Sequence, residues 1–95
     1  MKSYIIIFEF PALNSSTRKN LLMDRIREYG FFAFLTSNSC ILFTEESVVE
    51  VRDKLLKIID PEDKIFVGEL NAPAAWSNSI GKEVSEWIIN YLKQK

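Results

Sequence analysis

Glu9 is the residue whose type and position could support catalysis. It stands near the end of the apolar run Ile5 to Phe10, which is typical of a strand buried on both faces. A carboxylate at the end of a strand can bind Mg²⁺ or Mn²⁺, and a symmetric dimer could bring two copies together for phosphodiester hydrolysis. The alternative is a surface carboxylate that forms an ordinary ion pair with Lys64, at the start of a neighbouring strand.

The composition excludes several other kinds of chemistry. The 95 residues contain no histidine and one cysteine, Cys40. Ser-His and Cys-His catalysis, histidine metal sites and cysteine-rich zinc sites are therefore ruled out within this sequence. Cys40 begins the apolar run Cys40 to Phe43 and is predicted to be a small buried side chain. No cofactor is expected, unless Glu9 binds Mg²⁺ or Mn²⁺.

Basic residues suggest a second kind of function. Arg18, Lys19 and Arg25 lie in the expected first helix, which has a mild excess of positive charge, and they are candidate nucleic-acid contacts. The chain as a whole carries a net charge of −1, so no general attraction to nucleic acid is expected. A surface that binds an oppositely charged protein, or a plain solvated helix face, would explain the same residues.

Two polar stretches are interpreted as structural. Residues 14–17 form the polar start of the first helix and lack the glycines of a phosphate-binding loop, so they are predicted to cap that helix. Asp60, Glu62 and Asp63 form an acidic turn whose spacing lacks the pattern of a calcium loop. This turn is predicted to be solvated.

The apolar periodicity predicts alternating strands and helices. Strands are expected over residues 3–10, 31–35, 40–43 and 64–70. A first helix is expected over residues 16–29. A second is expected to begin at a cap, Thr44, with Glu45 and Glu46 in its first turn. A last helix is expected along an apolar stripe of Ile80, Val84, Trp87, Ile88 and Tyr91. The order β-α-β-β-α-β plus a C-terminal helix indicates an α+β fold, a ferredoxin-like sandwich with an antiparallel sheet in the order 4-1-3-2.

One domain is expected over residues 1–95, with a core over 1–70 and a connection and C-terminal helix over 71–95. No apolar run approaches the roughly 20 residues of a transmembrane helix. Glu9 interrupts the apolar start of the chain, and no small-residue cleavage pattern follows it. A cytoplasmic protein without membrane contact is therefore predicted.

The first strand is apolar on both faces, although two helices cover only one face of such a sheet. Tyr4, Ile6 and Phe8 alternate with residues 5, 7 and 9 along this strand. A homodimer across the open face is predicted, with the last helix helping to close it. Its expected interface comprises Tyr4, Ile6, Phe8, Phe66, Trp76 and Trp87. The alternative is a monomer covered by its own last helix.

Binding of RNA on the sheet is not expected. The third strand, Ser39 to Phe43, lacks the basic-glycine-aromatic motif that RNA-recognition sheets carry there.

Four segments carry a resemblance to a known superfamily. They are Tyr4 to Glu9, Leu35 to Leu42, Asp60 to Val67, and Ala74 to Trp76. Together they make the chain similar to the CRISPR-associated endoribonuclease-like superfamily, which includes virulence-associated protein D relatives and short uncharacterised proteins. The resemblance implies a homodimer formed through the sheet. It also implies a metal-binding residue at the end of the first strand, where members credited with nuclease activity carry an aspartate.

Glu9 stands at that position in this chain. Its extra methylene moves the carboxylate by about a bond length, and catalytic geometry is sensitive to displacements of about 1 Å. We therefore predict a small dimeric binding protein without catalytic activity, which acts through protein or nucleic-acid contacts. The alternative is a nuclease that depends on Mg²⁺ or Mn²⁺ and uses paired Glu9 residues across a dimer cleft.

Overall fold

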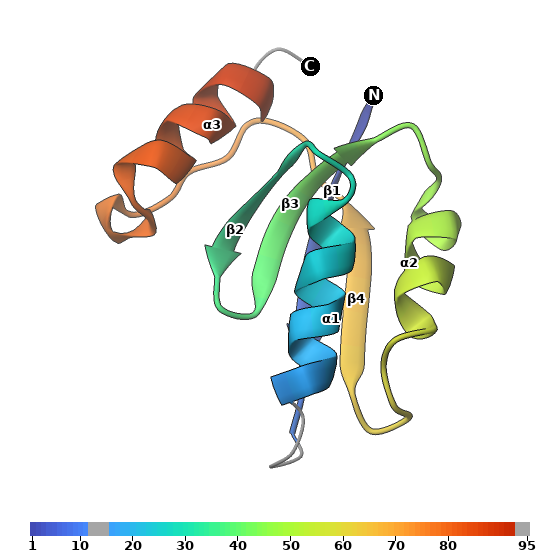
Figure 1. Cartoon of the computed structure of the whole chain (residues 1–95). Helices are drawn as coiled ribbons and strands as arrows, with labels where there is room; N and C mark the ends of the chain where they lie inside the picture. Colours follow the sequence, from blue (N-terminus) through green and yellow to red (C-terminus); the bar gives the residue numbers. More distant parts are fainter. Residues whose placement is uncertain (12–15, 93–95) are drawn as a thin grey trace.

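The computed structural model describes residues 1–11 and 16–92 as a sheet of four strands with helices on both faces (Figure 1). The elements follow one another as β1 (Lys2–Glu9), α1 (Ser16–Arg27), β2 (Phe32–Thr36), β3 (Ser39–Thr44), α2 (Val48–Leu56), β4 (Lys64–Glu69), a short 3₁₀ helix η1 (Asn78–Ile80) and α3 (Lys82–Leu92). None of the helices in the described part of the chain has the length and apolar character needed to cross a membrane.

The sheet has the predicted order and direction. Its strands are arranged β2-β3-β1-β4, which is the order 4-1-3-2 read from the other edge, and the neighbouring strands are antiparallel. The mixed α+β class is therefore confirmed. The element order is β-α-β-β-α-β-α, so a seventh element distinguishes it from the six-element ferredoxin-like topology.

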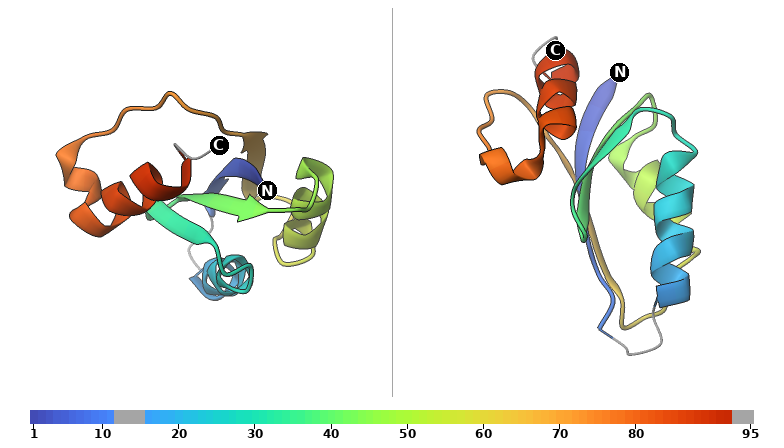
Figure 2. Two further views of the ribbon diagram at one scale, coloured as in Figure 1. Left: turned by 90° about the horizontal axis from the view of Figure 1, so that it is seen from above. Right: turned by 60° about the vertical axis from the view of Figure 1, so that its left-hand side comes forward.

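The principal core lies between the sheet and the helices α1 and α2. In the right-hand view of Figure 2, these two helices lie on one side of the sheet and α3 lies on the other. The buried side chains of this core are Tyr4, Ile6, Phe8, Leu22, Ile26, Cys40, Leu42, Val51 and Leu55. Cys40 is thus buried as predicted, and burial raises the pKa of its thiol to about 12.

The prediction that Tyr4, Ile6 and Phe8 lie on the open face is wrong. Their side chains are almost fully buried under α1 and α2. The opposite set of β1 side chains faces away from these helices, and Ile7 is 49% exposed. Alternation along a strand defines two sets of side chains, but it does not say which set the helices cover when both are apolar.

The second helix begins later than predicted. Ser47 is its N-cap, and it forms a reciprocal capping box with Glu50: its hydroxyl accepts from the Glu50 amide at 3.1 Å, and its own amide donates to Glu50 Oε1 at 2.9 Å. Thr44 instead ends β3, where its hydroxyl accepts a hydrogen bond from the Glu46 amide. Glu45 and Glu46 therefore precede the helix.

The helix α3 covers part of the other face of the sheet. Ile41 and Phe43 of β3 pack there against Ile88 and Leu92 of α3. Trp87 meets the Phe43 ring edge-to-face, with ring centroids 5.4 Å apart. Both predicted interface tryptophans thus pack within their own chain.

Trp76 fixes the connection between β4 and α3. Its indole Nε1 donates a hydrogen bond to the Ser85 hydroxyl at 2.9 Å, and its ring joins the apolar layer beneath α3. In the right-hand view of Figure 2, α3 lies beside the upper part of the sheet. The lower part, where β1 ends and β4 begins, has no described helix on that side.

Candidate functional site

Glu9 lies at the uncovered end of β1 and forms the ion pair that was considered as the alternative to catalysis. It is the register partner of Lys64, and Glu9 Oε1 lies 3.7 Å from Lys64 Nζ. Both side chains face solvent, at 62% and 78% exposure. No group of three or more Asp, Glu, His or Cys side chains able to hold a metal ion occurs among residues 1–11 and 16–92. One copy of the chain therefore presents Glu9 as a surface charge.

Two exposed apolar side chains lie next to this ion pair. Ile7 and Phe66 are register partners on β1 and β4, and Phe66 is 53% exposed. Phe66 lies over Gly68: a Cβ atom at Gly68 would come within 3.1 Å of the Phe66 ring. We call Ile7, Glu9, Lys64 and Phe66 the open-face strip.

Arg18, a predicted nucleic-acid contact, is engaged by the acidic turn before β4. Its Nε and Nη2 donate to the Asp63 carboxylate at 2.8 and 3.0 Å, and its Nη1 lies 3.2 Å from Asp60 Oδ2. Asp63 also accepts a hydrogen bond from the Asp60 amide at 2.9 Å, and its side chain is fully buried. The prediction of a solvated turn is therefore wrong for Asp63.

This arrangement sets the ionisation of both partners. The hydrogen bond from Arg18 lowers the pKa of the Asp63 carboxyl, and the same bond raises the pKa of Arg18. The guanidinium joins the start of α1 to the turn before β4. Arg18 therefore contributes to the fold rather than to a free basic surface.

Lys19 and Arg25, the other two predicted nucleic-acid contacts, differ in their surroundings. Lys19 Nζ donates to Asn38 Oδ1 at 3.2 Å, which links α1 to the β2–β3 turn. Arg25 Nε lies 3.5 Å from Glu28 Oε1 in an exposed pair along α1. Arg25 also borders a groove, and it is the only one of these three residues among the groove's lining residues.

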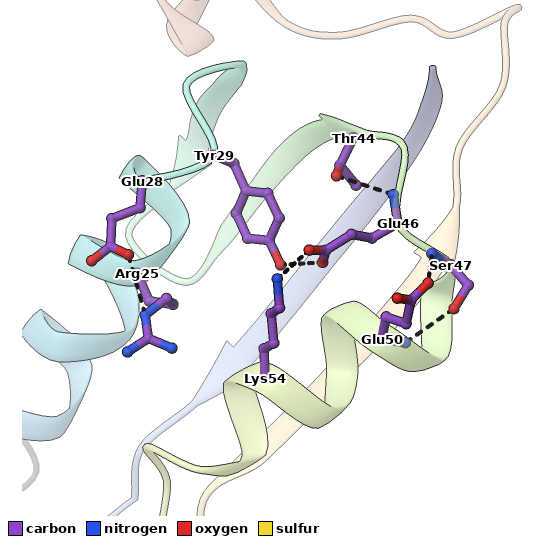
Figure 3. Close-up of polar contacts among 8 residues, drawn as sticks. All are labelled: Arg25, Glu28, Tyr29, Thr44, Glu46, Ser47, Glu50 and Lys54. Atoms are coloured by element: carbon purple, nitrogen blue, oxygen red, sulfur yellow. Dashed lines mark hydrogen bonds and ion pairs between the residues drawn. The ribbon is translucent and has the colours of Figure 1, made fainter.

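The groove lies between α1 and α2 and was not predicted. It has a volume of about 490 Å³. We call it the α1–α2 groove, and its lining residues are Arg25, Glu28, Tyr29, Glu46, Lys54 and Lys57. Figure 3 shows Tyr29, from the turn after α1, and Lys54, from α2, both pointing toward Glu46.

Glu46 joins the two walls of the groove. It accepts a hydrogen bond from the Tyr29 hydroxyl at 2.7 Å on Oε1, and Lys54 Nζ bonds to Oε2 (Figure 3). The Lys54 ammonium also lies 5.7 Å from the centroid of the Tyr29 ring. The backbone carbonyl of Glu46 accepts from the Tyr4 hydroxyl at 2.7 Å, which ties the group to β1.

Electrostatics keep Glu46 ionised and Tyr29 neutral at neutral pH. The hydrogen bond from Lys54 lowers the pKa of Glu46, and the bond from Tyr29 acts in the same direction. Burial raises the pKa of the Tyr29 hydroxyl, and its bond to Glu46 raises it further. Glu46 is therefore a carboxylate that accepts from a neutral phenol and an ammonium.

The sequence contains no local signal for the groove. Tyr29 fits the apolar stripe of the first helix, and Glu46 fits the first turn of a helix that was expected to begin earlier. Lys54 stands eight positions after Glu46, and the two meet because α2 begins only after Ser47. The contact depends on tertiary structure, which periodicity does not reveal.

No protein-family model matches this chain, and neither does any curated protein at a significant level.

Proposed function

We propose that the protein is a small non-catalytic binding protein that forms a homodimer through the open-face strip. The observation that carries this proposal is the exposure of Ile7 and Phe66 side by side on the two strands, at the part of the sheet that α3 leaves uncovered. Adjacent exposed apolar side chains on a sheet face are typical of protein-protein contacts.

The chemistry of the strip favours a second copy as the partner. A two-fold axis places the same patch on both sides of an interface, so a patch must be complementary to itself. The strip combines an apolar pair, Ile7 and Phe66, with one acid and one base, Glu9 and Lys64. Apolar side chains can then pack against their counterparts, while Glu9 faces Lys64 of the partner subunit.

The proposal includes the fold class and the family. We assign β1 to β4 with α1 and α2 to the ferredoxin-like class, and α3 to an addition that covers the sheet. We also assign the chain to the CRISPR-associated endoribonuclease-like superfamily, on the sequence segments that resemble it. The sheet order and the exposed strip support both assignments.

The same dimer leaves the nuclease alternative open to test, because the strip contains Glu9. A two-fold axis through the strip would bring two Glu9 residues to one interface. The ion pair of Glu9 with Lys64 and the exposure of both side chains argue against catalysis. We therefore favour a binding function over phosphodiester hydrolysis.

Light scattering tests the dimer directly. Wild-type protein at micromolar concentration is expected to show twice the monomer mass of 11.0 kDa. Phe66→Ser is expected to shift it toward monomer. Leu21→Ser is the matched control, because Leu21 is 52% exposed but lies on α1, on the other side of the sheet. A wild type that is monomeric throughout would refute the proposal.

A further inference from the structure

The α1–α2 groove has more hydrogen-bond donors than its own acceptors use. Its lining contributes three cations, Arg25, Lys54 and Lys57, and two carboxylates, Glu28 and Glu46. A guanidinium and an ammonium each carry several N–H donors, whereas both carboxylates are already occupied. Glu46 accepts from Tyr29 and Lys54, and Glu28 pairs with Arg25.

Lys57 is the cation whose N–H donors are available for a ligand. No side-chain partner of Lys57 is found in the described part of the chain. It stands three positions after Lys54 at the end of α2, so the two lie on one side of the helix. Arg25 borders the groove from α1, and its contact with Glu28 is a long, exposed one at 3.5 Å. Cations therefore line both walls of the groove.

One of these cations, Lys54, is held in place by other residues of the groove. Glu46 holds Lys54 through its carboxylate, and Tyr29 fixes Glu46 from the α1 side. The Tyr4 hydroxyl anchors the Glu46 backbone to the sheet. Lys54 is thus tied through Glu46 to the turn after α1 and to β1 before any ligand enters, which lowers the cost of ordering this one side chain on binding.

We propose that the α1–α2 groove binds the phosphate group of an anionic ligand, held by Arg25 from α1 and by Lys54 and Lys57 from the end of α2. A phosphate presents acceptor oxygens on several sides, which matches donors that come from two helices. An arginine fork combined with lysine point charges is a common donor set for phosphate. The source of the phosphate is either a small free molecule or the backbone of a single-stranded nucleic acid.

A structural role of the lysines is the competing explanation. Cations in the last turn of a helix interact favourably with its dipole, and Lys54 and Lys57 both stand at the end of α2. Such a role predicts no saturable binding of anions. The two explanations therefore differ in a measurement that does not depend on stability.

The experiment titrates wild-type protein with pyrophosphate and, separately, with a single-stranded DNA oligonucleotide about ten nucleotides long. Binding is followed by NMR shifts of the backbone amides of α1 and α2 and of the Arg25 Nε–H. Saturable shifts around the groove are expected with at least one of the two. The ligand that binds more tightly identifies the source of the phosphate.

Variants assign the binding to the groove. Arg25→Gln and Lys57→Gln together are expected to weaken the affinity about tenfold, since each removes a charge-assisted hydrogen bond. Lys82→Gln is the control: it removes one charge from an exposed lysine at the start of α3, on the opposite face of the sheet and outside the open-face strip, and the affinity should change less than about twofold.

Two results would overturn the proposal. One is the absence of saturable binding of either ligand by wild-type protein. The other is equal weakening by Lys82→Gln and Lys57→Gln, which would show a general charge effect. The open-face strip lies on the other side of the sheet, so loss of dimerisation and loss of anion binding are separate outcomes.

Discussion

Arg18 binds Asp63 through two hydrogen bonds, from Nε to Oδ2 at 2.8 Å and from Nη2 to Oδ1 at 3.0 Å. The pair joins the first turn of α1 to the turn that leads into β4, across 45 positions of the chain. Asp63 is fully buried at its side chain, whereas Arg18 retains some exposure. The contact is bidentate, a geometry that favours specificity as well as strength.

Asp63→Asn is expected to lower the Tm at pH 7 and to change the pH dependence of stability. The folded pKa of Asp63 lies below its ordinary value of 3.8, so the wild type gains stability from this carboxylate at pH values above it. That gain is lost as the pH falls through the folded pKa. The difference in Tm between wild type and Asp63→Asn should therefore narrow below about pH 4.

Asp53→Asn is the control for this comparison. Asp53 also pairs with an arginine, Arg52, but both side chains are more than half exposed. Its substitution should leave the pH profile of the Tm close to that of wild type. An equal effect of the two substitutions would contradict the role given to Asp63.

Phe8→Ala and Phe66→Ala are expected to separate folding from association. Phe8 is buried beneath α1 and α2, so its truncation should cost about 3–5 kcal/mol in the free energy of unfolding. Phe66 is 53% exposed, and its truncation should change the stability of the monomer by less than about 1 kcal/mol. Denaturant unfolding at several protein concentrations measures both effects. A large, concentration-independent loss in Phe66→Ala would place this side chain in the core instead.

Glu9→Lys and Lys64→Glu test the orientation of the proposed dimer. Each variant makes the two strip charges of one chain equal in sign, so each should weaken its own homodimer roughly tenfold. A mixture of the two variants should form a heterodimer, because every cross-chain contact then joins opposite charges. Native mass spectrometry with one variant isotope-labelled detects it. A mixture no more dimeric than its components would show that the two charges do not meet across the interface.

Wild-type protein is expected to cleave neither RNA nor DNA in the presence of Mg²⁺ or Mn²⁺. The physical reason is that Glu9 lies exposed beside Lys64, without a cluster of further metal ligands among the described residues. Gel assays on single- and double-stranded substrates provide the measurement. Metal-dependent cleavage that disappears in Glu9→Ala, while the dimer persists, would establish the nuclease instead.

Tyr29→Phe is expected to destabilise the protein by about 1–2 kcal/mol. The substitution removes the hydroxyl that donates to Glu46 at 2.7 Å and keeps the ring near Lys54. Thermal unfolding measures the loss. Tyr91→Phe is the control: Tyr91 contributes ring contacts with Trp87 and Phe43 in the α3 layer, and the substitution should cost little.

Strand order followed from sequence because apolar runs and turns define β1 to β4 strongly. The sequence did not show which face of β1 the helices α1 and α2 cover, because the side chains on both faces are apolar: residues 4, 6 and 8 on one face, and residues 5 and 7 on the other. The start of α2 was misplaced because Thr44 and Ser47 are both suitable caps, and only the capping box with Glu50 distinguishes them. The α1–α2 groove depends on contacts between Tyr29, Glu46 and Lys54, whose spacing has no periodic signature.

The division of the core into two layers has a consequence for partial unfolding. The principal core under α1 and α2 contains no side chain of α3, whereas Ile41 and Phe43 pack against α3 on the other face of the sheet. Local opening of α3 would therefore expose an apolar surface of the sheet while the principal core stays closed. Apolar surface exposed in this way favours aggregation.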